Sequence, residues 1–127
     1  MNILLDSHAL IELIKNADFG ERIMRIVDEA DGVFTTSANL YETRYRLEET
    51  LGEKKADEAI ADIRITATSL PIDDLIALGA SRLRKKFAGK KMGAVDFFVL
   101  AAAEEHDLKI VSGNPHFKGL ANVFFVE

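Results

Sequence analysis

The chain has 127 residues, a length typical of one domain, and we expect residues 1–127 to fold as a single domain. Apolar residues make up 48% and charged residues 29%, which indicates a folded globular protein and excludes a disordered one. The absence of cysteine excludes a disulfide scaffold, a thiolate zinc site and a cysteine nucleophile. The longest apolar run, residues 97–103, is too short to span a membrane, and no signal peptide is visible. We therefore expect a cytoplasmic protein with no membrane partner.

The net charge of −5 argues against nucleic-acid binding, but the charges are unevenly distributed. Residues 75–95 contain no acidic side chain and carry +6, so the rest of the chain carries −11. A local basic surface can bind phosphate on an acidic protein, although cations are also favoured at a helix C-terminus without any ligand. We call these side chains the basic ridge: Arg82, Arg84, Lys85, Lys86, Lys90 and Lys91.

The predicted elements alternate between strands and helices along the chain. Short apolar runs predict strands, and apolar residues at helical spacing predict amphipathic helices. In chain order we expect a strand at 2–5, helices at 7–16 and 18–30, a strand at 33–36, and helices at 38–51 and 53–65. A strand at 67–70, a helix from 74 into the basic ridge, a helix at 95–106, and strands at 109–112 and 123–126 follow. Ser37 is predicted to cap the helix at 38–51.

This alternation predicts an α/β fold, a three-layer α/β/α sandwich with a short, mostly parallel central sheet. Ligands of such open sheets bind beyond the carboxyl ends of the strands. Asp6 follows the first strand, residues 35–37 end the second, and residues 112–114 end the strand at 109–112. We therefore expect these three clusters to lie at one edge of the sheet.

Three acidic residues are candidates for a shared site at this edge. Asp6 and Asp96 stand among apolar residues, where a carboxylate is costly unless it is paired or binds a metal ion. The alternatives are a helix N-cap for Asp6 and a first-turn acid for Asp96. Glu42 lies one turn into the helix after the second strand, and its alternative is a surface ion pair with Arg46.

Carboxylate, hydroxyl and amide oxygens are the ligands that Mg²⁺ and Mn²⁺ prefer. Two such ions can hold the attacking and leaving oxygens of a phosphodiester displacement. Such a site needs neither histidine nor cysteine. His8, His106 and His116 show no metal-ligand spacing, although His116 lies two residues after Asn114.

Four segments carry these features in a fixed order. An apolar strand ends in Asp6-Ser7, a helix start leads to Glu42, Asp96 opens a helix of small residues, and a strand ends in Ser112-Gly113-Asn114. Together they resemble the four motifs of the PIN domain, the ribonuclease fold of VapC-type toxins in toxin–antitoxin pairs. The resemblance covers nearly the whole chain.

The resemblance implies a metal-dependent endoribonuclease that hydrolyses RNA phosphodiester bonds, the toxin of a type II pair. It further implies a homodimer, and a small antitoxin protein as partner. Asp6, Glu42 and Asp96 are then the catalytic residues. The cofactor, Mg²⁺ or Mn²⁺, is expected at Asp6 and Asp96, with Glu42 and Asn114 as further candidate ligands. Ser7 and Ser112 are expected to support the site, and the basic ridge, joined by Arg44 and Arg46, to bind RNA.

One position departs from the family pattern: Asn114 stands where the family commonly has Asp. The amide brings no charge, so a second metal ion is expected to bind less well, and the number of ions stays open. The same departure leaves open a catalytically weak module that binds RNA or a protein. A DNA-directed nuclease of the same fold is a further alternative.

Overall fold

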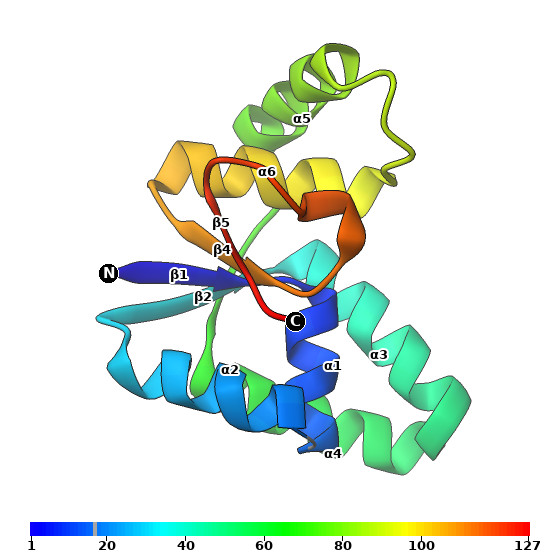
Figure 1. The fold of residues 1–127 in the computed structure, drawn as a ribbon. Helices are drawn as coiled ribbons and strands as arrows, with labels where there is room; N and C mark the ends of the chain where they lie inside the picture. Colours follow the sequence, from blue (N-terminus) through cyan, green and yellow to red (C-terminus); the bar gives the residue numbers. More distant parts are fainter. Residues whose placement is uncertain (17) are drawn as a thin grey trace.

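The computed structural model describes residues 1–16 and 18–127, which form six α-helices, one short 3-10 helix and a five-stranded sheet (Figure 1). The first half contains β1 (Asn2–Leu5), α1 (Ser7–Lys15), α2 (Asp18–Glu29), β2 (Gly32–Thr36), α3 (Ser37–Leu51), α4 (Glu53–Thr66) and β3 (Thr68–Leu70). The second half contains α5 (Asp74–Lys86), α6 (Ala94–His106), β4 (Lys109–Ser112), the 3-10 helix η1 (Pro115–Phe117) and β5 (Val123–Phe125). The expected alternation of strands and helices is confirmed, with element ends shifted by one or two residues.

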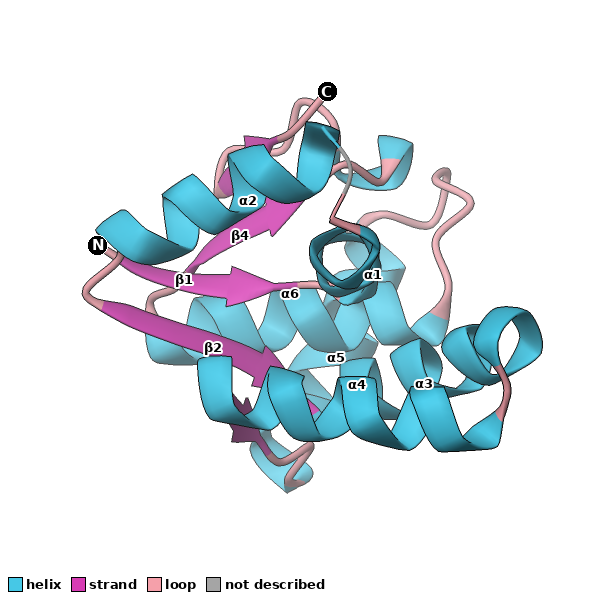
Figure 2. Ribbon diagram, turned by 90° about the horizontal axis from the view of Figure 1, so that it is seen from below, coloured by secondary structure: helices cyan, strands magenta, loops and turns pink. Residues whose placement is uncertain are grey.

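The sheet has the strand order β3-β2-β1-β4-β5, and every neighbouring pair is parallel. Helices α5 and α6 cover one face, and α1, α2 and α4 cover the other (Figures 1 and 2). The predicted three-layer α/β/α sandwich is therefore confirmed, and its sheet is parallel throughout. Among the helices of the described residues, none combines the length and the apolar character that a membrane crossing requires.

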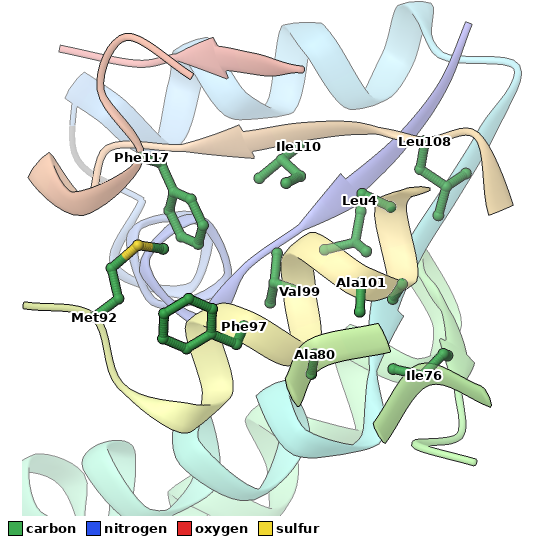
Figure 3. Close-up of a cluster of buried hydrophobic side chains, with 12 residues drawn as sticks. Leu4, Ile76, Ala80, Met92, Phe97, Val99, Ala101, Leu108, Ile110 and Phe117 are labelled. Atoms are coloured by element: carbon green, nitrogen blue, oxygen red, sulfur yellow. The ribbon is translucent and has the colours of Figure 1, made fainter. Parts of the chain in front are cut away.

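The central strands are apolar on both faces because helices cover both sides of the sheet. Ile3 and Leu5 are fully buried in the core cluster formed with α1, α2 and α4. Leu4 points to the opposite face and is fully buried in the cluster formed with α5 and α6 (Figure 3). Because successive side chains point to opposite faces, this strand of only four residues contributes to both core clusters.

The start of α3 differs from the prediction, because Thr36 and not Ser37 caps the helix. Thr36 has extended backbone angles, and its hydroxyl oxygen accepts the backbone N–H of Asn39 at 3.1 Å. Ser37 is already the first helical residue, and its hydroxyl accepts the backbone N–H of Ile72 instead. Both residue types are good caps, and Thr36 takes the position because it is the last extended residue before the helix.

The parallel topology brings four chain segments to one edge of the sheet. Strands β1, β2 and β4 all end there, and α1 and α3 begin directly after β1 and β2. Helix α6 precedes β4 and runs back across the sheet, so its first residue lies at the same edge (Figure 1). The expected gathering of the strand ends is therefore a consequence of the connections.

Candidate functional site

A cleft of about 600 Å³ opens at this edge of the sheet. Its lining includes the three predicted acids, Asp6, Glu42 and Asp96, together with Ser7 and Asn114. Ser112 lies directly beneath it, fully buried, and contacts Asp6. The structure thus brings the predicted catalytic, metal-binding and supporting residues together around one cavity.

Asp6 forms the floor of the cleft and is 3% exposed. One carboxylate oxygen, Oδ1, accepts the backbone N–H of Ala9 at 2.9 Å and so caps α1. The other, Oδ2, accepts the hydroxyl hydrogen of Ser112 at 2.5 Å. The N-cap considered as an alternative is therefore present, and the same side chain also lines the cleft.

Burial raises the pKa of Asp6 to about 7. The hydrogen bonds from Ser112 and Ala9 lower this pKa, and the nearby charges of Asp96 and Glu42 raise it further. Asp96 and Glu42 therefore lie close enough for their charges to act on Asp6. A cation bound there would stabilise the ionised form of Asp6, because it supplies the missing positive charge.

A continuous series of hydrogen bonds connects Asp6 to Asp96 through the segment after β4. Ser112 Oγ accepts the backbone N–H of Asn114 at 2.9 Å, and Asn114 Oδ1 accepts the backbone N–H of His116 at 3.0 Å. The ring nitrogen Nδ1 of His116 lies 3.1 Å from Oδ2 of Asp96. The segment therefore fixes the spacing of the two carboxylates, and Asn114 serves as the cap of η1.

Asp96 is held in place by its helix and by the core. Its Oδ2 also accepts the backbone N–H of Gly93 at 3.2 Å, which stabilises the first turn of α6. Its neighbour Phe97 and the neighbour of His116, Phe117, are buried in the same core cluster (Figure 3). The two aromatic anchors hold Asp96 and His116 at the rim, where the carboxylate is 16% exposed.

Glu42 lies on α3 at the side of the cleft, with 26% of its side chain exposed. Its Oε2 lies 3.5 Å from Arg46, one helical turn away. The ion pair considered as an alternative is thus present, yet both residues line the cleft. Because the pair is partly exposed and long, it contributes little to stability and leaves Glu42 free to change partners.

The cleft also contains Asn39, which the sequence analysis did not name, and His8, which it set aside. Asn39 is 1% exposed and donates from Nδ2 to Ser7 Oγ at 2.9 Å. Its place on the buried stripe of α3, one turn before Thr43, is the signal that could have identified it. His8 Nδ1 accepts the backbone N–H of Gly113 at 3.2 Å, and burial lowers the pKa of this histidine. His8 is therefore neutral, with its hydrogen on Nε2.

The predicted RNA-binding residues fall into two groups. Arg46 lines the cleft, whereas Arg44 pairs with Asp57 of α4 at 2.8 Å and with Glu48 of its own helix at 3.5 Å. The basic ridge lies on the end of α5 and the loop to α6, outside the cleft lining, with its six side chains exposed. The part of the chain that the structure describes offers no salt bridge to any of them. Three lie near aromatic rings: Arg84 lies 5.7 Å from the ring centre of Phe97, and Lys86 and Lys90 lie 5.5 Å and 5.9 Å from that of Phe87.

The donor chemistry of the cleft fits a hard divalent cation. Within residues 1–16 and 18–127, no three His, Asp or Glu side chains converge as a complete ligand set. Mg²⁺, however, commonly keeps several water ligands and takes only one or two carboxylates from the protein. Asp6 and Asp96 meet this requirement, because both are carboxylates that face one cavity and repel each other.

The model of the PIN domain family matches residues 3–123, so the chain belongs to this family. The resemblance drawn from the four motifs is thereby confirmed. Compared with curated protein sequences, the chain has no significant match.

Similar solved structures come from toxin–antitoxin systems. The toxin–antitoxin complex from Klebsiella pneumoniae is 20% identical, with a TM-score of 0.76 over 96% of this chain and 95% of that chain. VapBC2 from Rickettsia felis, bound to a DNA fragment from its promoter, is 14% identical, with a TM-score of 0.80 over 100% of both chains. VapC20 from Mycobacterium tuberculosis, a sarcin-ricin loop cleaving toxin, is 16% identical, with a TM-score of 0.73 over 87% of both chains. At these identities the likeness establishes the fold.

Proposed function

We propose that the protein is a metal-dependent endoribonuclease, the toxin of a type II toxin–antitoxin pair. The single observation that carries the proposal is that Asp6, Glu42 and Asp96, far apart in the sequence, line one cleft of a PIN domain. The reaction is the hydrolysis of an RNA phosphodiester bond. VapC20, which shares the fold, is a toxin that cleaves the sarcin-ricin loop.

Asp6 and Asp96 are the proposed metal ligands. The chemistry that bound Mg²⁺ or Mn²⁺ supplies is polarisation of the phosphodiester and activation of water. Asp6 is suited to the role because Ala9 and Ser112 hold both of its oxygens in a fixed orientation. The hydrogen bonds from Gly93 and His116 do the same for Oδ2 of Asp96.

Glu42, Asn114 and the supporting serines complete the proposed site. Glu42 adds a third negative charge at the side of the cleft, and its pairing with Arg46 allows it to turn toward a ligand. Asn114 contributes a neutral amide whose Oδ1 is already bonded to the His116 backbone. We therefore propose one firmly held metal ion, since a neutral fourth position weakens the binding of a second.

The basic ridge is the proposed contact surface for the RNA backbone. Three carboxylates in the cleft repel phosphate, so a separate cationic surface is needed to bring the substrate close. The ridge ends at Lys91, two residues before Gly93, which lines the cleft. Arg46 supplies a cation within the cleft itself, whereas Arg44 is occupied by Asp57.

The test is cleavage of a mixed, structured RNA in the presence of Mn²⁺, with an EDTA control. We compare the unmodified protein with Asp6→Asn and with Asp73→Asn. Asp73 is a matched control, because its side chain caps α5 through Ile76 just as Asp6 caps α1, but it lies outside the cleft. Metal-dependent cleavage that is lost only in Asp6→Asn supports the proposal.

Other outcomes lead to the two remaining functions. Cleavage of single-stranded or duplex DNA but not of RNA would establish a DNA-directed nuclease. Absence of cleavage together with absence of Mn²⁺ binding would indicate a binding module, the function that the neutral Asn114 favours.

The proposed protein partners are a second copy of the chain and a small antitoxin. Both VapBC2 and the Klebsiella pneumoniae structure are toxin–antitoxin assemblies, which supports the antitoxin as partner. Light scattering on the purified protein tests the homodimer. Co-expression with the neighbouring open reading frame, followed by purification of a complex, tests the antitoxin.

A further inference from the structure

Ser7 directly follows Asp6, and its buried hydroxyl accepts a hydrogen bond but donates none within the described part of the chain. It occupies the first position of α1, is 3% exposed and lines the cleft. Its oxygen accepts a hydrogen bond from Nδ2 of Asn39 at 2.9 Å. The structure gives its hydrogen no acceptor within the described part of the chain.

The orientation of the Asn39 amide follows from its contact with Thr36. Oδ1 of Asn39 lies 2.6 Å from Oγ1 of Thr36, a separation typical of O–H···O and short for N–H···O. Thr36 Oγ1 also accepts the backbone N–H of Asn39, so its own hydrogen is free to be donated to Oδ1. Thr36 is fully buried, and a flipped amide would leave that hydrogen without an acceptor.

This orientation determines what Ser7 can do. With Oδ1 facing Thr36, the amide nitrogen faces Ser7, and Ser7 must act as the acceptor in that contact. The hydroxyl hydrogen of Ser7 is then available to be donated to an acceptor in the cleft that Ser7 lines. Thr36 at the end of β2 thus orients Asn39, and Asn39 orients Ser7 as a hydrogen-bond donor beside Asp6.

A neutral donor has a defined use in this cleft. The ionised carboxylates around it are acceptors only, and they repel the oxygens of a phosphate group. Ser7 can donate to such an oxygen without adding to the negative charge. We propose that Ser7, oriented by Asn39, donates a hydrogen bond to a phosphate oxygen of the nucleic-acid substrate, an inference that rests on the proposed function. Asn39 is a positioning residue in this assignment, because it acts through Ser7.

The first experiment compares Ser7→Ala with Ser37→Ala in RNA cleavage with Mn²⁺. Ser37 is a matched control, since it occupies the first position of α3 just as Ser7 does in α1, but it is exposed and outside the cleft. Loss of a hydrogen bond to a charged oxygen is expected to lower kcat/KM about 10- to 100-fold in Ser7→Ala. Ser37→Ala is expected to retain full activity.

The second experiment tests whether Asn39 acts through the hydrogen of Ser7. A carboxylate at position 39 has no hydrogen to donate, so in Asn39→Asp the Ser7 hydroxyl must turn its hydrogen inward. Asn39→Asp is therefore expected to lower kcat/KM in the unmodified background and to add little in the Ser7→Ala background. Because Ser7 itself is intact in the single variant, the loss of kcat/KM in Asn39→Asp alone can be measured whether or not Ser7→Ala folds.

Two results would overturn the inference while leaving the proposed function intact. One is Ser7→Ala cleaving RNA as fast as Ser37→Ala, which would mean that the hydroxyl contacts no substrate. The other is an equal loss from Asn39→Asp in both backgrounds, which a change of charge or of packing would produce. Failure of the unmodified protein to cleave RNA, in contrast, would count against the proposed function itself.

Discussion

Ser112 donates its hydroxyl hydrogen to Oδ2 of Asp6 at 2.5 Å, although 106 positions separate the two residues in the chain. The contact joins the ends of β1 and β4, which are paired in parallel with Leu5 opposite Val111. It also begins the series of hydrogen bonds that reaches Asp96 through Asn114 and His116. The pairing of β1 with β4 and the segment after β4 therefore together set the spacing of the two carboxylates.

The buried carboxylate of Asp6 predicts a stability that falls as the pH rises. Its pKa is raised from 3.8 to about 7, so the folded state binds a proton that the unfolded chain releases near pH 4. In EDTA, the free energy of unfolding should decrease between about pH 4 and pH 7, as Asp6 is forced to ionise in the folded protein. Above about pH 7 this loss of stability should reach its full value. Asp6→Asn, which cannot ionise, should raise the free energy of unfolding by up to about 4 kcal/mol at pH 8 and by little at pH 4. Urea denaturation of both proteins at the two pH values measures the difference, and an equal effect at both would contradict it.

Divalent metal is expected to stabilise the folded protein. A cation that binds only the folded state relieves the repulsion around Asp6, and at 100 times its Kd it contributes about 2.7 kcal/mol. Thermal melts with and without Mn²⁺ at neutral pH should show an increase of several degrees in Tm. Asp96→Asn should reduce this increase, whereas Asp73→Asn should retain it. No change in Tm at millimolar Mn²⁺ would argue strongly against the metal site.

The basic ridge predicts a salt-dependent affinity for RNA. Lys85 and Lys86 are adjacent exposed lysines on α5, and Lys54 and Lys55 form an equivalent pair on α4. Neutralising the first pair to Gln should lower the slope of log Kd against log salt by up to about 1.4, or 0.7 for each lost contact to single-stranded RNA. Neutralising Lys54 and Lys55 in the same way should leave the slope unchanged. Fluorescence anisotropy at several salt concentrations measures both slopes, and equal slopes would remove the ridge from the binding surface.

Gly113 has no room for a side chain. A Cβ there would lie 2.4 Å from Cε1 of His8 and 2.8 Å from the carbonyl oxygen of Val126. Gly113→Ala is therefore expected to destabilise the protein by about 1–3 kcal/mol, since neighbouring atoms must shift. Gly89→Ala is the control, because no atom lies within 4 Å of the added carbon. Adding His8→Ala should restore only part of the loss in urea denaturation, as the backbone contact remains; full recovery would show that His8 alone causes the strain.

Thr43 offers a substitution that should not harm stability. Its Oγ1 is buried and has no hydrogen-bond partner in the described part of the chain. Thr43→Val removes this hydroxyl and keeps the shape, so the free energy of unfolding should stay the same or rise by about 1 kcal/mol. Thr36→Val should lower it by about 1–2 kcal/mol, because that hydroxyl caps α3. A loss of stability in Thr43→Val would reveal a partner for its hydroxyl.

The architecture could be predicted from the amino-acid sequence, because the spacing of apolar residues within each segment is local information. The run Ile3-Leu4-Leu5 predicts a strand covered on both faces, and the order of strands and helices allows few topologies besides a parallel sheet. Asp6 and Asp96 were identified for a related reason: both stand among apolar residues, where a carboxylate is costly unless it is paired or binds a metal ion. Glu42, one turn into its helix, was assigned to the site through the resemblance to the family motifs.

Which side chains face one another could not be predicted in this way, because it depends on how distant segments pack. Arg44 and Arg46 look equivalent in the sequence, but α4 packs beside α3 and draws Arg44 to Asp57, leaving Arg46 in the cleft. Asn39 shows its role only when β1 and β2 are adjacent, since its amide connects Thr36 on one strand end to Ser7 beyond the other. Such pairings depend on the register of distant segments and on the direction of single hydrogens, which no local pattern of residues specifies.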